Sequence, residues 1–140
     1  MVRTYGLTHI ALRVRDPARS AAFYQSVLGA QVVFASDDFV QIQTPGTRDV
    51  LVFERSRAGV GESGGIVHFG FRLRRAADID ASIRAVEDAG GTVTSHGDFV
   101  PGEPYLFGRD LDGYEFEIWF ELPTTVDPKP RRRSSASPPR

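Results

Sequence analysis

The chain has 140 residues, which is long enough for one compact domain with a buried core. It contains no cysteine, so disulfides, thiolate metal ligands and a cysteine nucleophile are excluded, and its only lysine, Lys129, lies outside the expected folded part. The net charge of −1 combines a basic C-terminal segment with an acidic remainder, a distribution that argues against a duplex-binding face.

The sequence gives no indication of secretion or membrane insertion. Its N-terminus lacks an apolar signal segment, and no apolar run approaches the roughly 20 residues that a helix needs to span a bilayer. We therefore expect a cytoplasmic protein that binds neither a membrane nor nucleic acid.

The first half of the chain is predicted to fold as a strand, a helix and three further strands. Residues 7–15 alternate strictly between apolar and polar positions, as in a half-buried strand, and His9 lies on the polar face. Asp16 followed by Pro17 predicts the start of a helix, and Gly29 predicts its end. Apolar and β-branched runs predict the remaining strands, at residues 32–34, 39–43 and 50–54.

The second half repeats this order. Residues 66–74 match residues 7–15 position by position, so that His68 falls on His9. Asp78 is expected to cap a helix that ends in the Ala-Gly-Gly run after it. Strands are predicted at residues 67–74, 92–95, 105–109 and 114–120, with a hairpin turn at 110–113. The repeat therefore predicts an α+β fold of two tandem βαβββ modules.

These modules are expected to form one domain over residues 1–122. Module 1 covers about residues 7–54, a glycine-rich linker covers 55–65, and module 2 covers about 66–121. The remaining segment, 123–140, is basic and rich in proline and serine. It lacks apolar periodicity, so we expect it to be disordered.

Strand phase predicts where the polar side chains meet. Helices need an apolar sheet face to pack on, so both histidines are expected to point to the other, concave face of a cupped mixed sheet whose outer face carries the helices. In the last strand Glu117 and Trp119 share that concave phase. Two imidazoles and one carboxylate that face a shared cavity indicate a 2-His-1-carboxylate metal site with positions open for substrate.

These features resemble the vicinal oxygen chelate superfamily, over about residues 7–121. The likeness rests on the duplicated modules, on the histidine near the start of each, and on the Asp-Leu-Asp-Gly turn that precedes Glu117. The group includes glyoxalase I, extradiol dioxygenases, methylmalonyl-CoA epimerase, and the fosfomycin- and bleomycin-resistance proteins. The resemblance implies one divalent ion (Fe²⁺, Mn²⁺, Ni²⁺ or Zn²⁺) on His9, His68 and Glu117. It also implies a homodimer, with ligands from one chain or from two.

The sequence departs from the family pattern in its first module. In the family pattern the first module also carries a carboxylate ligand, and that position is occupied here by Val52. We therefore expect three protein ligands rather than four. Glu54 lies two residues further on in the same phase, and it is a candidate catalytic base beside Glu117. The alternative interpretation of Glu54 is an exposed glutamate at the end of a strand.

Four residues are candidates for substrate binding. Trp119 is expected to line the cavity, and Tyr105 follows a loop rich in glycine and proline that either laps over the site or merely connects two strands. Arg13 and Arg72 share the histidine phase, so they either hold an anionic substrate or are solvated strand ends. His96 is expected at the surface, in a hairpin turn beside Gly97, and the alternative is an acid or base in the cavity.

The sequence thus favours a metal-dependent enzyme that acts on a small substrate chelated through vicinal oxygens. The reaction would be that of a lyase, an isomerase or a ring-cleaving dioxygenase. The alternative is a non-enzymatic, drug-sequestering protein similar to the bleomycin-resistance proteins, with a planar ligand held against Trp119 and no metal. The presence of all three ligand types favours the enzyme, because a binder does not need them.

Overall fold

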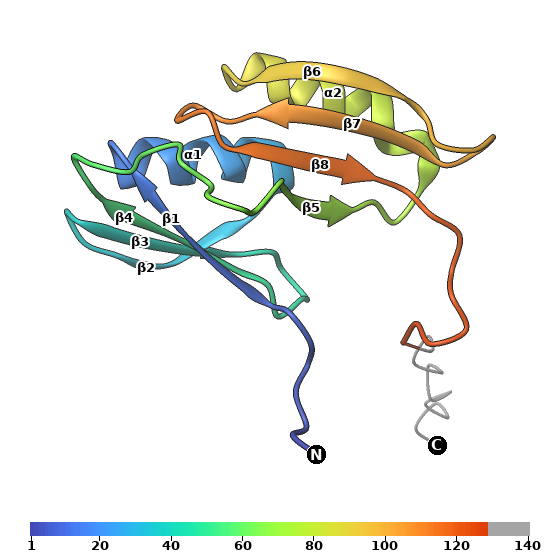
Figure 1. The fold of residues 1–140 in the computed structure, drawn as a ribbon, viewed down its shortest axis with the longest axis horizontal. Helices are drawn as coiled ribbons and strands as arrows, with labels where there is room; N and C mark the ends of the chain where they lie inside the picture. Colours follow the sequence, from blue (N-terminus) through green and yellow to red (C-terminus); the bar gives the residue numbers. More distant parts are fainter. Residues whose placement is uncertain (129–140) are drawn as a thin grey trace, which may run out of the picture.

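The computed structural model describes residues 1–128, and its elements follow the order that the repeat predicts (Figure 1). The elements of module 1 are β1 (His9–Val14), α1 (Pro17–Leu28), β2 (Gln31–Ala35), β3 (Phe39–Gln43) and β4 (Val50–Arg55). Those of module 2 are β5 (Phe69–Arg72), η1 (Ala76–Asp78), α2 (Ile79–Asp88), β6 (Thr92–Asp98), β7 (Pro104–Arg109) and β8 (Glu115–Trp119). The predicted α+β fold of two βαβββ modules is confirmed.

Each module forms its own four-stranded mixed sheet. The strand orders are β1-β4-β3-β2 and β5-β8-β7-β6, so the two sheets have the same topology. In each sheet the first strand pairs in parallel with the last, and the other pairs are antiparallel. Figure 1 shows the sheets as two separate arrays of strands, with α1 between the array of β2, β3 and β4 and the array of β6, β7 and β8.

Helix α1 begins and ends where the sequence predicts. The Asp16 side chain accepts hydrogen bonds from the backbone N–H groups of Ala18 (3.1 Å) and Arg19 (3.2 Å), two donors that the helix itself cannot satisfy. Gly29 ends the helix with φ of 68°, and its N–H donates to the Gln25 carbonyl. Local capping chemistry therefore fixes both ends of α1.

Helix α2 begins at the predicted place, but the predicted side-chain cap by Asp78 is absent. The Asp78 carboxylate accepts a hydrogen bond from Nε of Arg75 (3.1 Å) and makes no side-chain cap to the helix. The 3₁₀ turn η1 leads the chain into α2 instead. No helix within residues 1–128 is long and apolar enough to cross a membrane.

The main hydrophobic core is shared by both modules. Tyr24 of α1 is fully buried, and its ring stacks on Phe53 of β4, with centroids 5.5 Å apart. The same ring contacts Phe69 and Phe116 of module 2, at centroid distances of 6.4 and 6.1 Å. Burial of α1 therefore depends on both sheets at once.

The hairpin turn between β7 and β8 joins the modules by hydrogen bonds. Tyr24 Oη donates to the buried Asp110 carboxylate over 2.6 Å, and Ser20 Oγ donates to Asp112 over 3.0 Å. Burial raises the pKa of Asp110 above its ordinary value. Burial and the charge of Asp110 together raise the pKa of Tyr24 well above its ordinary value. The predicted hairpin turn thus also forms a polar junction between the two modules.

The first part of the predicted disordered tail contacts module 2. The Arg72 guanidinium donates to both carboxylate oxygens of Asp127, over 3.2 and 3.1 Å. Asp127 also accepts hydrogen bonds from the backbone N–H and the hydroxyl of Thr124. The rest of that tail, residues 129–140, lies outside the described residues.

Candidate metal and substrate site

The strands divide their side chains between two faces as predicted. In β1, His9 is exposed while Leu12 and Val14 are buried in the core. In β8, Phe116 is fully buried while Glu117 is only partly buried. The histidine phase therefore faces away from the helices in both modules.

His68 and Glu117 are in direct contact. His68 Nε2 lies 3.1 Å from Glu117 Oε2, and the two side chains are 31% and 13% exposed. The contact arises because His68 immediately precedes β5, which pairs in parallel with β8. The other ring nitrogen of His68, Nδ1, is buried and has no hydrogen-bond partner within residues 1–128. An imidazole and a carboxylate thus converge on one point.

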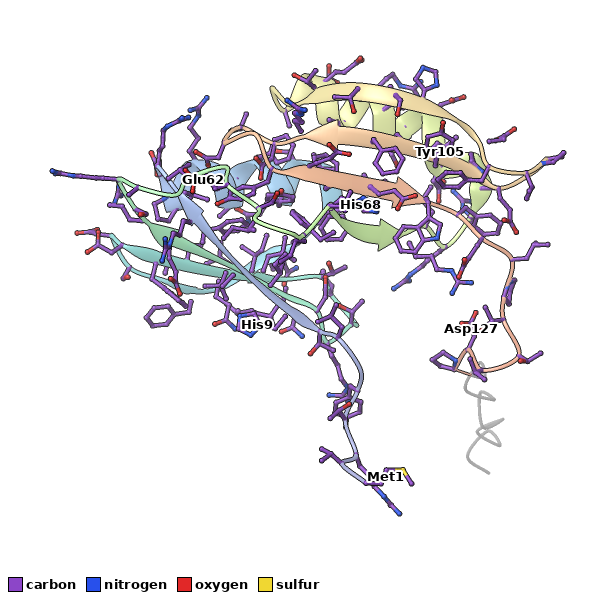
Figure 2. All side chains as sticks on the ribbon, in the orientation of Figure 1. Met1, His9, Glu62, His68, Tyr105 and Asp127 are labelled. Atoms are coloured by element: carbon purple, nitrogen blue, oxygen red, sulfur yellow. The ribbon has the colours of Figure 1, made fainter. Side chains whose placement is uncertain are left out.

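An open pocket of about 670 Å³ between β1 and β5 has all three predicted metal ligands in its walls. His9 comes from the first sheet, whereas His68, Glu117 and Trp119 come from module 2. Figure 2 shows His9 beside β1 and His68 beside β8. Within residues 1–128, however, no group of three histidine, cysteine, aspartate or glutamate side chains is close enough to hold a metal ion. One chain therefore brings His68 and Glu117 together and leaves the third predicted ligand, His9, apart from them.

The donor atoms of this pair fit a divalent ion. Imidazole nitrogen and carboxylate oxygen are ligands that Fe²⁺, Mn²⁺, Ni²⁺ and Zn²⁺ all accept. Two ligand atoms that share one ion at about 2.1 Å are about 3.0–3.4 Å apart. The separation of 3.1 Å between His68 Nε2 and Glu117 Oε2 falls in this range. A third ligand would still be needed to complete the predicted set.

The substrate-binding candidates lie at different distances from this pocket. Trp119 is part of its wall, whereas Tyr105, Arg13 and Arg72 lie outside the walls that the described residues form. Arg72 is occupied by the chain's own carboxylates, including that of Asp127 at 3.1 Å. Tyr105 pairs with Trp119 across β7 and β8, so it is the next side chain on the same face.

The structure brings neither Glu54 nor His96 to the pocket. Glu54 lies at the exposed end of β4, and Val52, which occupies the carboxylate place of module 1, is buried. His96 lies within β6 and not in the hairpin turn as expected, although it is exposed. The hairpin is longer than predicted because β6 and β7 stay paired as far as Asp98 and Pro104.

Two aromatic residues on the same face as His68 and Glu117 were not predicted from the sequence as site residues. The Phe107 ring lies 5.0 Å from the His68 ring and 5.6 Å from Tyr105, and Phe99 stacks on Tyr105 at 4.1 Å. These four rings form an aromatic row across the face of the second sheet that also carries Glu117, opposite the helix-packed face. The alternation of Tyr105 and Phe107 along β7 is a signal that would have identified Phe107. No sequence signal places Phe99, because its position depends on the hairpin path.

Comparisons with known proteins agree with this fold. A family model described as the glyoxalase/bleomycin resistance protein/dioxygenase superfamily matches residues 6–118. A catechol-2,3-dioxygenase of Bacillus subtilis is 28% identical over 127 residues, which cover 85% of this chain and 44% of that protein. The chain thus spans less than half the length of this relative. An uncharacterized Pseudomonas aeruginosa protein, PA2024, is 32% identical over 129 residues, 84% of this chain and 89% of that one.

The likeness extends to solved structures. The fosfomycin resistance protein FosX of Mesorhizobium loti has a TM-score of 0.70 at 19% identity, with 86% of this chain and 95% of that chain covered. At this identity the likeness shows the fold and not the reaction. His9, His68 and Glu117 all lie within the segment that the family model matches.

Proposed function

Because this chain belongs to the glyoxalase/bleomycin resistance protein/dioxygenase superfamily, we propose that it is a metal-dependent enzyme of the glyoxalase or dioxygenase type. His9, His68 and Glu117 would hold its divalent ion, at which a small substrate with two adjacent oxygens would bind. The observation that carries this proposal is the 3.1 Å contact between His68 Nε2 and Glu117 Oε2, beside a pocket that His9 also lines.

When bound, a divalent ion would supply positive charge to stabilise an enolate or oxyanion, or, in the case of Fe²⁺, would activate dioxygen. The residues of the chain position the reactants around it. Glu117 and His68 are partly buried, which limits their contact with water and keeps both donor atoms directed at one point. Trp119 forms the wall next to them and shields one side of the substrate. We assign no role to Glu54, because it lies outside this pocket.

We propose that His9 joins the His68–Glu117 pair of a second copy of the chain. This proposal is supported by the observation that, within residues 1–128 of one chain, His9 does not lie close enough to His68 and Glu117 to share a metal ion with them. A two-fold arrangement that places β1 of one copy beside β5 of the other would create two equivalent sites. The exposure of His9 leaves it available for that contact.

Metal analysis of protein purified without chelators tests the site. We expect about one equivalent per chain in the wild type, and loss of metal in His68→Ala and in Glu117→Ala. His96→Ala is the matched control, because His96 is exposed on β6. Less than about a tenth of an equivalent, with no rise in melting temperature on adding metal, would refute the proposal.

Mixed subunits test whether the site is shared between chains. His9→Ala and Glu117→Ala each remove both sites of a dimer. If sites are shared, a mixed dimer regains one intact site of two. Random reassembly of equal amounts should then restore about a quarter of the wild-type metal capacity. If all ligands come from one chain, mixing restores no capacity, and the two-chain arrangement is wrong while the metal site itself stands.

A second candidate function is the binding of a planar molecule without metal. The aromatic row from His68 to Phe99 favours it, since stacked rings provide a surface for such a ligand. This function predicts that Glu117→Ala leaves ligand affinity unchanged. A large loss of affinity in that variant would argue for the enzyme.

A further inference from the structure

The indole of Trp119 lies directly against the backbone of Gly70. A Cβ atom built on Gly70 would be 2.7 Å from Cζ3 of Trp119, 3.3 Å from its Cε3, and 3.3 Å from the carbonyl oxygen of Glu117. Carbon atoms in contact lie about 3.5–4.0 Å apart, so the indole occupies the space in which any other residue would place its side chain. A glycine is therefore required at this position if the indole is to lie where it does.

Both residues line the pocket that contains the proposed metal ligands. In the register of β5 and β8, Gly70 lies opposite Glu117 and Arg72 lies opposite Trp119. The indole thus leans along the strand towards Gly70, the residue opposite Glu117. Since Gly70 contributes no side chain, the β5 position opposite Glu117 consists of backbone with the flat indole against it.

We propose that Gly70 is a specificity-determining residue, which positions the Trp119 indole as a flat surface for a planar, aromatic or conjugated part of the substrate. The inference rests on the proposed function only for the metal-bound end of that substrate. A side chain at position 70 would push the indole out of its place and into the pocket. Gly70 itself touches neither metal nor reacting atoms, so it is a positioning residue.

The chain contains a matched control. Gly97 lies on β6 of the same sheet, opposite Tyr105. A Cβ atom on Gly97 would lie 3.5 Å from Cε1 of Tyr105, which is an ordinary contact. Gly97→Ala therefore adds the same methyl group beside an aromatic ring without displacing it. Of these two variants, only Gly70→Ala should displace the aromatic ring beside it.

Fluorescence reports the position of the ring directly, because Trp119 is the only tryptophan of the chain. In Gly70→Ala we expect a shifted emission maximum and a changed acrylamide quenching constant, whereas Gly97→Ala should match the wild type. Circular dichroism checks that each variant is folded. Unchanged emission and quenching in a folded Gly70→Ala protein would overturn the proposal.

Two metal-chelating probes then test specificity. 4-Nitrocatechol carries its adjacent oxygens on an aromatic ring, and acetohydroxamate carries them on a small aliphatic group. Gly70→Ala should weaken nitrocatechol binding about three- to tenfold, which corresponds to one aromatic stacking contact. Acetohydroxamate affinity and metal content should stay at wild-type values. Equal losses of affinity for both probes would overturn the proposal, because the substitution would then act on the metal-binding residues and not on the indole surface.

If the proposed metal-dependent function is wrong, the inference about Gly70 can still be tested on its own. If the wild type binds no metal, nitrocatechol is titrated into metal-free protein and quenching of Trp119 is measured. Weaker quenching in Gly70→Ala than in Gly97→Ala supports the inference, and equal quenching overturns it. If Gly70→Ala does not fold, the double variant with Trp119→Leu should fold, because the clash is removed. A double variant that also fails to fold would refute the assigned clash.

Discussion

Replacing Tyr24 by phenylalanine removes one hydroxyl from the junction of the modules and leaves the ring. The hydroxyl donates to Asp110 over 2.6 Å, while the ring stacks on Phe53. Asp110 keeps two backbone donors, the N–H groups of Asp112 and Tyr114, both at 3.0 Å. The perturbation is therefore the loss of one buried hydrogen bond to a carboxylate.

The stability that this hydrogen bond contributes is expected to fall at alkaline pH. A hydrogen bond to a charged group contributes about 1.5–3 kcal/mol, so we expect Tyr24→Phe to lose about 2 kcal/mol at neutral pH. The pKa of Tyr24 is raised well above the ordinary value of 10.0, so above pH 10 the unfolded chain loses this proton while the folded chain keeps it. Wild-type stability then falls by about 1.4 kcal/mol per pH unit from this group alone. The variant lacks this term, so the difference in stability between the two proteins should shrink as the pH rises above about 10.

Urea unfolding followed by circular dichroism measures both stabilities between neutral and strongly alkaline pH. The difference between the proteins should be constant up to about pH 10 and then decrease. A difference that stays constant well above pH 10 would refute the raised pKa of Tyr24. A difference below about 0.5 kcal/mol at neutral pH would refute the hydrogen bond as a contributor to the junction.

Three further predictions concern other contacts. Since burial raises the pKa of Asp110, the folded state holds that proton to higher pH than the unfolded chain does. The stability of the wild type relative to Asp110→Asn should therefore fall as pH rises from about 4 through the raised pKa, and an increase in urea titrations would contradict this. Gly91→Ala places a Cβ atom 2.8 Å from the Phe23 ring and should cost about 1–3 kcal/mol in thermal or urea unfolding; an unchanged stability would show that the ring has room to move. The Arg72 guanidinium holds the pKa of Asp127 below its ordinary value, so Arg72→Ala should raise it in a carbon-13 NMR titration, and an unchanged value would disprove the pairing.

Much of the fold could be predicted from the sequence because it depends on local patterns. The alternation in residues 7–15 places His9 and Val14 on opposite faces, and this follows from strand geometry in any context. The same argument placed Glu117 on the face opposite Phe116. The capping residues Asp16 and Gly29 also act within a few positions of themselves.

The site depends on distances that no local pattern contains. Strand phase put His9 and Glu117 on equivalent faces, but the separation of the two sheets depends on the core that lies between them. The pairing of Arg72 with Asp127 depends on the path of the chain after β8, which has no periodic signal. The contact between Gly70 and Trp119 follows from the strand register and the side-chain rotamer together.

The shared core has a consequence for how the duplicated halves fold. Tyr24 of the first half and Phe116 of the second contact each other and are both fully buried, so neither half can bury its own helix-facing surface alone. Two fragments cut within the linker should therefore be unstructured when separate and should fold when mixed. In hydrogen exchange, the slowest amides of both halves should open in a single cooperative event. Although the two modules repeat in sequence, neither is stable alone. They unfold together as one unit.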